Sequence, residues 1–141
     1  MSWKDSVKKA KDRPQLFEDV QILVGDDLIT VRVFKVPGVQ WNEAVALSGP
    51  REGSMVDELR GFDADSVARA LLVEFAAVVE DGEVKRLTED EWAELYGVIE
   101  GEGIEGIANT FWVQNQVKPV ADREAAKKAL SGSGVKKSGS L

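Results

Sequence analysis

Two runs rich in apolar residues lie within 17–36, and the second, over 28–36, alternates with polar residues at a period that is typical of strands with one buried face. The runs, near 18–24 and 28–35, flank the residues Gly25-Asp26-Asp27. Glycine and aspartate favour the tight turn of a hairpin. Pro37-Gly38 ends the second run, because proline has no amide hydrogen to donate to a sheet. The pattern therefore predicts a β-hairpin.

From residue 39 onward the apolar residues recur every three or four positions, which is typical of helices. We predict a short helix over 39–47 and a polar loop that ends near Gly61. A longer helix follows, with Asp63 or Asp65 as its cap. It carries the clearest apolar stripe of the sequence, at Val67, Leu71, Phe75 and Val78.

Asp81-Gly82 breaks the chain, and two further helices are expected after it. Thr88, with Glu91 three residues later, has the form of a capping box. The helix that it begins would bury Trp92, Leu95, Tyr96 and Ile99. The next helix runs from Ile104 to about Asn115, and we expect Pro119 to limit it.

The predicted fold class is α+β, with a small N-terminal β-hairpin followed by about four helices. The chain of 141 residues falls within the size range of one domain. We expect a basic N-terminal arm over 1–16 and a compact α+β domain over 17–118. Residues 119–141 form a helix-prone basic segment, helical over 121–130, with a mobile Gly/Ser/Lys-rich tail over 131–141.

The sequence contains neither cysteine nor histidine. Disulfides, thiolate catalysis and Ser–His–Asp triads are therefore excluded, together with the commonest ligands of transition metals. We interpret the many neighbouring carboxylates as caps and turns rather than as a glycosidase pair or a calcium loop. We expect a binding protein with no catalytic activity, no metal and no cofactor.

A literal GxGxxG motif is present at Gly101-Glu102-Gly103-Ile104-Glu105-Gly106. A dinucleotide site needs a strand before this motif, whereas here a helix is predicted. Glu102 and Glu105 would also repel phosphates. We interpret the glycines as a sharp turn between two helices, and we expect no nucleotide binding.

The net charge of −7 is unevenly distributed. Residues 1–13 have a balance of +3 and residues 117–141 one of +4, which leaves −14 for residues 14–116. Such an acidic body disfavours specific nucleic-acid binding, and it also maintains solubility. No apolar stretch approaches the ~20 residues of a membrane span. We expect a soluble protein of the cytoplasm with no membrane partner.

Phe111, Trp112 and Val113 are three adjacent bulky residues on a predicted helix. Successive helical positions lie about 100° apart, so all three cannot face one core. One of them, with Trp112 the first candidate, would lie at a partner interface, where tryptophan is enriched. Wrapping by the C-terminal segment is an equally good explanation.

The order of several segments resembles the tail assembly chaperones of long-tailed bacteriophages, particularly those of actinobacteria. The resemblance spans about residues 17–130 and rests on degenerate motifs in a shared order: Val36-Pro37-Gly38, Trp41-Asn42-Glu43, Leu87-Thr88-Glu89-Asp90-Glu91-Trp92-Ala93-Glu94-Leu95 and Ile107-Ala108-Asn109-Thr110-Phe111-Trp112-Val113-Gln114-Asn115. It implies a protein that keeps the tape measure protein soluble while tail-tube subunits polymerise around it.

The resemblance also implies further partners and a place of action. The C-terminal segment would recruit the major tail-tube protein, and the chaperone could form a homo-oligomer. It would act in the cytoplasm of the infected host and be absent from mature virions. Such chaperones are often made in two forms by programmed frameshifting, which the lysine pairs at 127–128 and 136–137 allow.

Two other classes of function explain parts of the sequence. An acidic inhibitor or nucleic-acid mimic would use the carboxylates of the body against a basic partner, but it leaves the basic ends without a role. A structural virion component, such as a connector or tail subunit, would be retained in purified particles.

Overall fold

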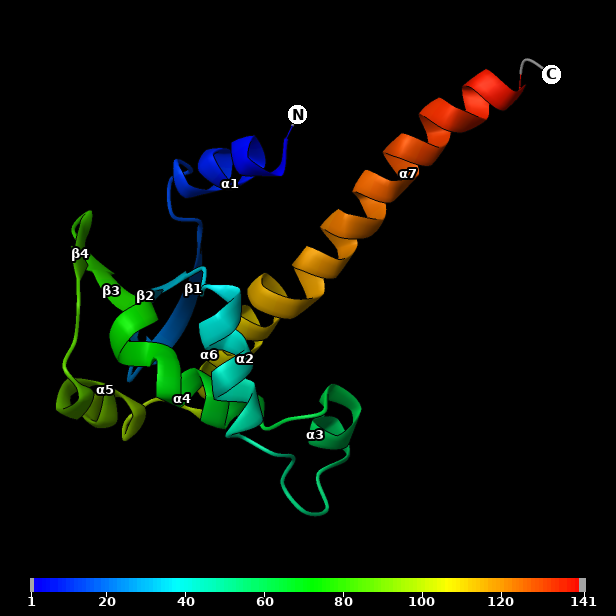
Figure 1. Cartoon of the computed structure of the whole chain (residues 1–141). Helices are drawn as coiled ribbons and strands as arrows, with labels where there is room; N and C mark the ends of the chain where they lie inside the picture. Colours follow the sequence, from blue (N-terminus) through cyan, green and yellow to red (C-terminus); the bar gives the residue numbers. More distant parts are fainter. Residues whose placement is uncertain (1, 140–141) are drawn as a thin grey trace.

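The computed structural model describes the backbone of residues 2–139 and the side chains of residues 2–132. Four antiparallel strands form one sheet in the order β1-β2-β3-β4, and helices pack on it (Figure 1). The α+β class predicted from the sequence is confirmed. The elements are α1 (Trp3–Lys11), β1 (Phe17–Val24), β2 (Asp27–Phe34), α2 (Gly38–Ala46), α3 (Met55–Arg60), α4 (Ala64–Phe75), β3 (Ala76–Glu80), β4 (Glu83–Lys85), α5 (Glu89–Tyr96), α6 (Gly101–Trp112), the π-helix η1 (Val113–Val117) and α7 (Lys118–Gly139).

The predicted hairpin is confirmed to within a few residues. β1 and β2 pair from Phe17 opposite Phe34 to Val24 opposite Asp27. Gly25 adopts a φ of 61°, a conformation that costs glycine little. This register places the buried Ile22, Val31 and Val33 on one face of the sheet.

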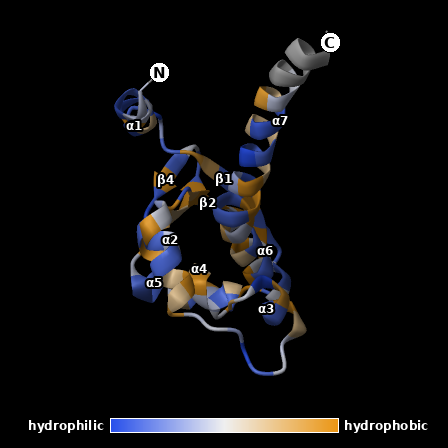
Figure 2. Cartoon of the chain, turned by 45° about the vertical axis from the view of Figure 1, so that its right-hand side comes forward, coloured by the Kyte–Doolittle hydropathy of each residue, from blue (hydrophilic) through white to orange (hydrophobic). Residues whose placement is uncertain are grey.

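The helices α4 and α6 cover that face and form the core with it (Figure 2). The opposite face of the sheet carries Phe17, Leu23 and Leu28, which are exposed. The molecule is therefore two layers deep, and its core lies between the sheet and the helices.

The helix predicted through Val78 ends three residues earlier. Of the two predicted caps, Asp63 is the one that caps α4, by accepting hydrogen bonds from the amides of Asp65 and Ser66. The prediction was wrong for residues 76–80, which form β3 and pair with β2, so that Val78 lies opposite Val31. Strand pairing buries Ala76, Ala77 and Val78 on the sheet, and tertiary context here overrides helical spacing.

The capping box at the start of α5 is confirmed. The Thr88 hydroxyl accepts from the amide of Glu91, and the Glu91 carboxylate accepts from the amide of Thr88. Trp92 is buried, as its predicted inward position requires. The predicted stripe extends too far along the chain, because Ile99 lies beyond α5 and bridges to Val24 of β1.

The glycines of the GxGxxG motif do not form a turn between helices, as we expected; Gly101, Gly103 and Gly106 lie within α6. A Cβ atom on Gly103 would lie 3.5 Å from Ile22, and one on Gly106 would lie 3.5 Å from Val20. The small residues therefore let α6 approach β1 closely.

Pro119 does not end the helical path, contrary to the sequence-based expectation. The chain continues from α6 through η1 into α7, where Pro119 is the second residue. Proline is tolerated in the first turn of a helix, because its missing amide hydrogen is not needed there. Because Pro119 lies in the first turn of α7, directly after the π-helix, the helical path from α6 to α7 is not broken at the proline.

Two helices lie where the sequence predicted none. α1 occupies most of the basic N-terminal arm, and α3 lies within the polar loop before Gly61. α7 extends away from the body (Figure 1). The predicted mobile tail over 131–141 falls almost wholly on residues whose side chains lie outside the described range.

Candidate functional site

The three adjacent residues Phe111, Trp112 and Val113 face different surroundings. Phe111 is completely buried in the core. Trp112 is partly buried against the core, and the guanidinium of Arg60 lies 4.5 Å from its ring centre. Val113 is exposed. The structure therefore does not gather these side chains into one exposed surface.

The π-helix η1, which begins at Val113, attaches the end of α6 to the β2–α2 connection and to α2. The amide of Val36 donates to Asn115 Oδ1 over 3.0 Å, and the indole nitrogen of Trp41 donates to Gln116 Oε1 over 3.3 Å. Lys35 Nζ donates to the carbonyl of Gln114 over 2.7 Å. Burial lowers the pKa of Lys35. These contacts give residues after Phe111 a structural role.

A more exposed apolar surface lies on the segment from Ser48 to Asp63, here named the braced loop. Its ends meet where the Asp63 amide donates to the Ser48 carbonyl over 2.9 Å. Phe62 anchors it to the core, with its ring edge-to-face against Trp41 at 5.9 Å between centroids. The loop is thus closed at its base, as in compact Ω-loops.

An ion pair holds the interior of the braced loop. Asp57 is 1% exposed and accepts from Nε of Arg51 at 2.8 Å, from Nη2 at 3.1 Å and from the Arg51 amide at 2.9 Å. Asp63 lies 3.5 Å from the same guanidinium. Hydrogen bonds from Arg51 hold the pKa of the Asp57 carboxyl far below its usual range. The buried charge is therefore fully paired.

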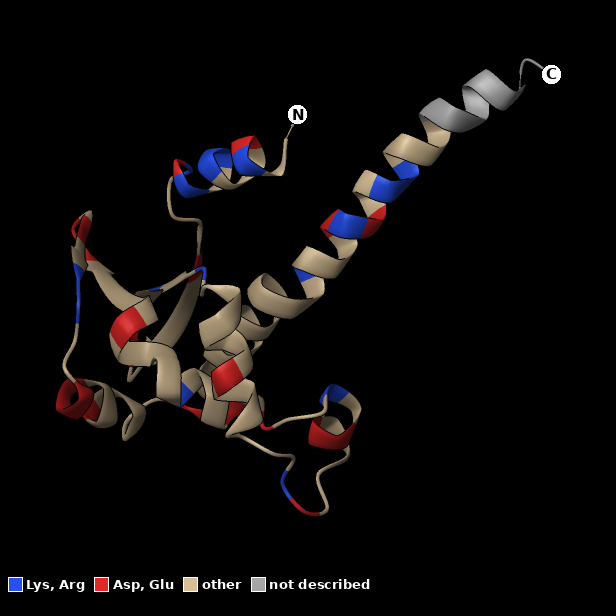
Figure 3. Ribbon diagram, in the orientation of Figure 1, with Lys and Arg blue, Asp and Glu red and all other residues tan. Residues whose placement is uncertain are grey.

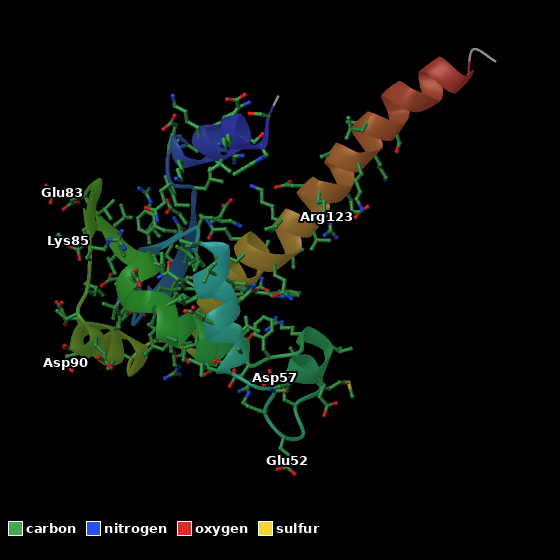
Figure 4. All side chains as sticks on the ribbon, viewed as in Figure 1. Glu52, Asp57, Glu83, Lys85, Asp90 and Arg123 are labelled. Carbon is green, nitrogen blue, oxygen red and sulfur yellow. The ribbon has the colours of Figure 1, made fainter. Side chains whose placement is uncertain are left out.

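The short helix α3 forms the second half of the braced loop, after the turn at Glu52, which lies at the tip (Figure 4). The Asp57 amide donates to Ser54 Oγ, which caps the helix, and Gly61 ends it at a φ of 90°. Because Asp57 points into the loop, the residues two positions before and after it point outward. Those residues are Met55 and Leu59, which are 75% and 83% exposed.

Leu47, at the end of α2, and Val56 are also exposed beside or on the braced loop. We name Leu47, Met55, Val56 and Leu59 the α3 surface. Its side chains make no contribution to the core, although the loop that carries them is held by an internal ion pair. Exposed apolar side chains on a segment held by internal contacts make the α3 surface a candidate for binding another protein.

Sequence reasoning missed the α3 surface because its supporting contacts are not periodic. The run Arg51-Glu52-Gly53-Ser54 has the composition of a loop, and six residues of helix are too few for a repeating stripe. Ser54 followed by Asp57 was the one local signal for a helix start. The Arg51–Asp57 pairing becomes visible only in the folded loop.

Several carboxylates of the body are engaged in ion pairs, such as Asp19 with Arg32 and Asp65 with Arg69. Within the described residues, no group of three or more potential ligands could hold a metal ion. In the same part of the chain, no helix has the length and apolar character that crossing a bilayer requires.

Comparisons with protein-family models, with curated proteins and with solved structures gave no match for this chain.

Proposed function

We propose that this chain is a non-catalytic assembly chaperone of a long-tailed bacteriophage that binds the tape measure protein and keeps it soluble. The observation that carries the proposal is the α3 surface. Met55 and Leu59 are held outward by a loop whose ion pair and closed base leave little conformational freedom to lose on binding.

A tape measure protein is a suitable client for such a surface. Long helices with apolar stripes aggregate when the stripes remain bare. Apolar side chains at i and i+4 on one helix can pack against the i, i+3 and i+4 positions of another. Methionine adapts its shape to different partners, which suits a surface that meets successive stripes of one long helix.

The charge of the body supports the same proposal. Residues 14–116 carry a balance of −14, which keeps a complex with an apolar client in solution. The basic segment 119–141, whose α7 carries Arg123, Lys127 and Lys128 on exposed positions, would recruit the major tail-tube protein. A chaperone of this kind acts in the host cytoplasm and leaves before the virion is complete.

The proposal is tested by co-expressing the chain with the tape measure protein of the same genome and measuring soluble, co-purifying client. The double variant Met55→Ser/Leu59→Ser should lose most of the soluble client. Removing two hot-spot side chains, at about 1–2 kcal/mol each, weakens binding roughly 30- to 700-fold. Val98→Ser is the control, because Val98 is also exposed and follows α5, which lies on the other side of the body from α3 (Figure 1).

Different outcomes separate the possible roles. Equal solubility with the double variant and the control would exclude the α3 surface as the client site. A client that stays insoluble with the wild-type chain and with its frameshifted longer form would refute the chaperone role. Partner binding that weakens steeply with salt would favour an acidic inhibitor, and retention in purified particles would favour a virion component.

A further inference from the structure

The N-terminal helix α1 has an apolar face that remains exposed among the described residues, although Val7 and Ala10 line an open groove with Phe75. None of its described residues is buried, and Trp3 is 72% exposed (Figure 1). Its first turn is closed by a capping box between Ser2 and Asp5. Isolated helices shorter than about 12 residues are marginal in water, and α1 has nine. A docking partner would supply the missing stabilisation.

The residues of α1 divide into two adjacent stripes. Trp3, Val7 and Ala10 are spaced by four and three positions and share one face. Lys4, Lys8 and Lys11 have the same spacing one residue later, and so form a basic stripe beside the apolar one. The partner surface must therefore combine an apolar groove with a negatively charged rim.

A groove of that kind lies between α4 and α5. It encloses about 220 Å³ and is lined by Arg69, Leu72, Val73, Glu89, Trp92, Ala93 and Tyr96. The two helices carry one basic residue, Arg69, and six acidic ones: Asp65, Glu74, Glu89, Asp90, Glu91 and Glu94. Figure 3 shows the contrast between the red first turn of α5 and the mostly blue α1.

Two polar groups of this groove are left incomplete within a single chain. Among the described residues, the indole nitrogen of Trp92 and the hydroxyl of Tyr96 are buried without a hydrogen-bond partner. Buried polar groups in folded proteins almost always have partners. The groove therefore contains polar groups whose hydrogen bonds the described part of a single chain does not supply.

We propose that α1 of one copy docks in the α4–α5 groove of a second copy of this chain. Trp3 anchors the contact in the apolar groove, and the basic stripe faces the carboxylates of α5. Charge complementarity between the N-terminal segment, at +3, and the acidic body selects this partner.

The placement of α1 on its own chain leaves Trp3 available to a second copy. α1 lies at the top of the body in Figure 1, whereas α5 lies at its lower left. In this position Val7 and Ala10 line an open groove with Val36 and Phe75 of the same chain. Trp3 does not line that groove and is 72% exposed, so the anchor of the proposed contact has no site on its own chain among the described residues.

A complementation experiment tests the proposal with the full chain alone, independently of the proposed function and of any client. Trp3→Ser removes the anchor, and Ala93→Arg fills the groove. Each variant should dimerise at least about tenfold more weakly than the wild type in sedimentation equilibrium. An equimolar mixture should recover dimer, because an intact α1 from one variant meets an intact groove from the other.

Charge variants provide the second arm. Lys4→Glu/Lys8→Glu should weaken the dimer, and combination with Glu89→Lys/Asp90→Lys should restore it. Lys9→Glu is the matched control, because Lys9 lies outside both stripes. A wild-type chain that stays monomeric at all concentrations, or a dimer insensitive to Trp3→Ser, would overturn the proposal. So would concentration-independent protection of α1 amides from hydrogen exchange, which would mean docking on its own chain.

Discussion

Asp57 is the one charged side chain buried to this degree in the described part of the chain, and it belongs to a loop rather than to the core. Its carboxylate accepts two side-chain hydrogen bonds and one amide hydrogen bond from Arg51. Breaking such a pair leaves an uncompensated group away from water, which is strongly destabilising. The conformation of the braced loop therefore depends on this residue.

Asp57→Asn is expected to lower stability at neutral pH and to remove part of its pH dependence. Because the folded-state pKa of Asp57 is lowered, the pair stabilises the protein above the ordinary carboxyl pKa of about 4. That stabilisation is lost as the pH falls through the folded-state pKa. Urea unfolding from pH 7 to pH 3 should show a smaller decrease in the variant. Glu52→Gln, in the same loop, should behave like the wild type.

Neighbouring residues also differ sharply in burial within the run 111–113. Phe111 is held completely inside and Val113 reaches solvent, although both are bulky and adjacent to Trp112. The arginine above the Trp112 ring comes from α3, fifty-two positions earlier. Sequence spacing predicted that the three side chains would point in different directions. Which of them points into the core depends on the elements that α6 packs against.

At the level of elements, α6 shows how small residues bring a helix close to a sheet. Gly103 and Gly106 face β1, and this close approach buries Ile22 beneath the helix. Glycine in a helix interior costs about 0.5–1 kcal/mol relative to alanine. Whether alanine is better at each position depends on whether its methyl group fits against the strand.

Gly106→Ala is expected to stabilise the protein by about 0.5–1 kcal/mol in urea unfolding. The added Cβ would lie 3.5 Å from one methyl group of Val20, an ordinary contact distance. Gly61→Ala is the contrasting control, because Gly61 ends α3 at a φ of 90° and alanine is strained there. It should destabilise by about 1 kcal/mol. Destabilisation by Gly106→Ala would mean that the helix packs against β1 too tightly to accept a methyl group.

At the scale of the whole molecule, the two ends contribute little to the core. α1 has no buried residue among those described, and residues 120–132 are exposed. The contacts that close the body end with η1, through Asn115 and Gln116. The body should therefore fold without either end.

A chain of residues 14–123 is expected to unfold cooperatively, within about 0.5 kcal/mol of the full chain at a protein concentration low enough to keep both monomeric. A chain of residues 14–113 is the control. It lacks the side chains that bond to Val36 and Trp41, and it should be clearly less stable in urea. Equal stability of the two truncated chains would remove the structural role assigned to η1.

Local chemistry along the chain determines much of this fold. The alternation over 28–36 and the turn residues before it predicted the hairpin. The candidate caps Asp63 or Asp65, and Thr88, predicted the starts of α4 and α5. These signals are local, because a turn, a cap or a face is set by residues a few positions apart. The absence of cysteine and histidine, with the chemistry that it excludes, is likewise a property of the sequence alone.

The tertiary structure decided what depends on distant partners. Residues 76–80 form a strand because they pair with the edge of β2. Pro119 fits in the helical path because the π-helix η1 ends just before it and α7 starts there. The α3 surface exists because Arg51 and Asp57 meet inside a closed loop. Burial, pairing and exposure are properties of the packed chain, and no spacing along the sequence encodes which residue will meet another.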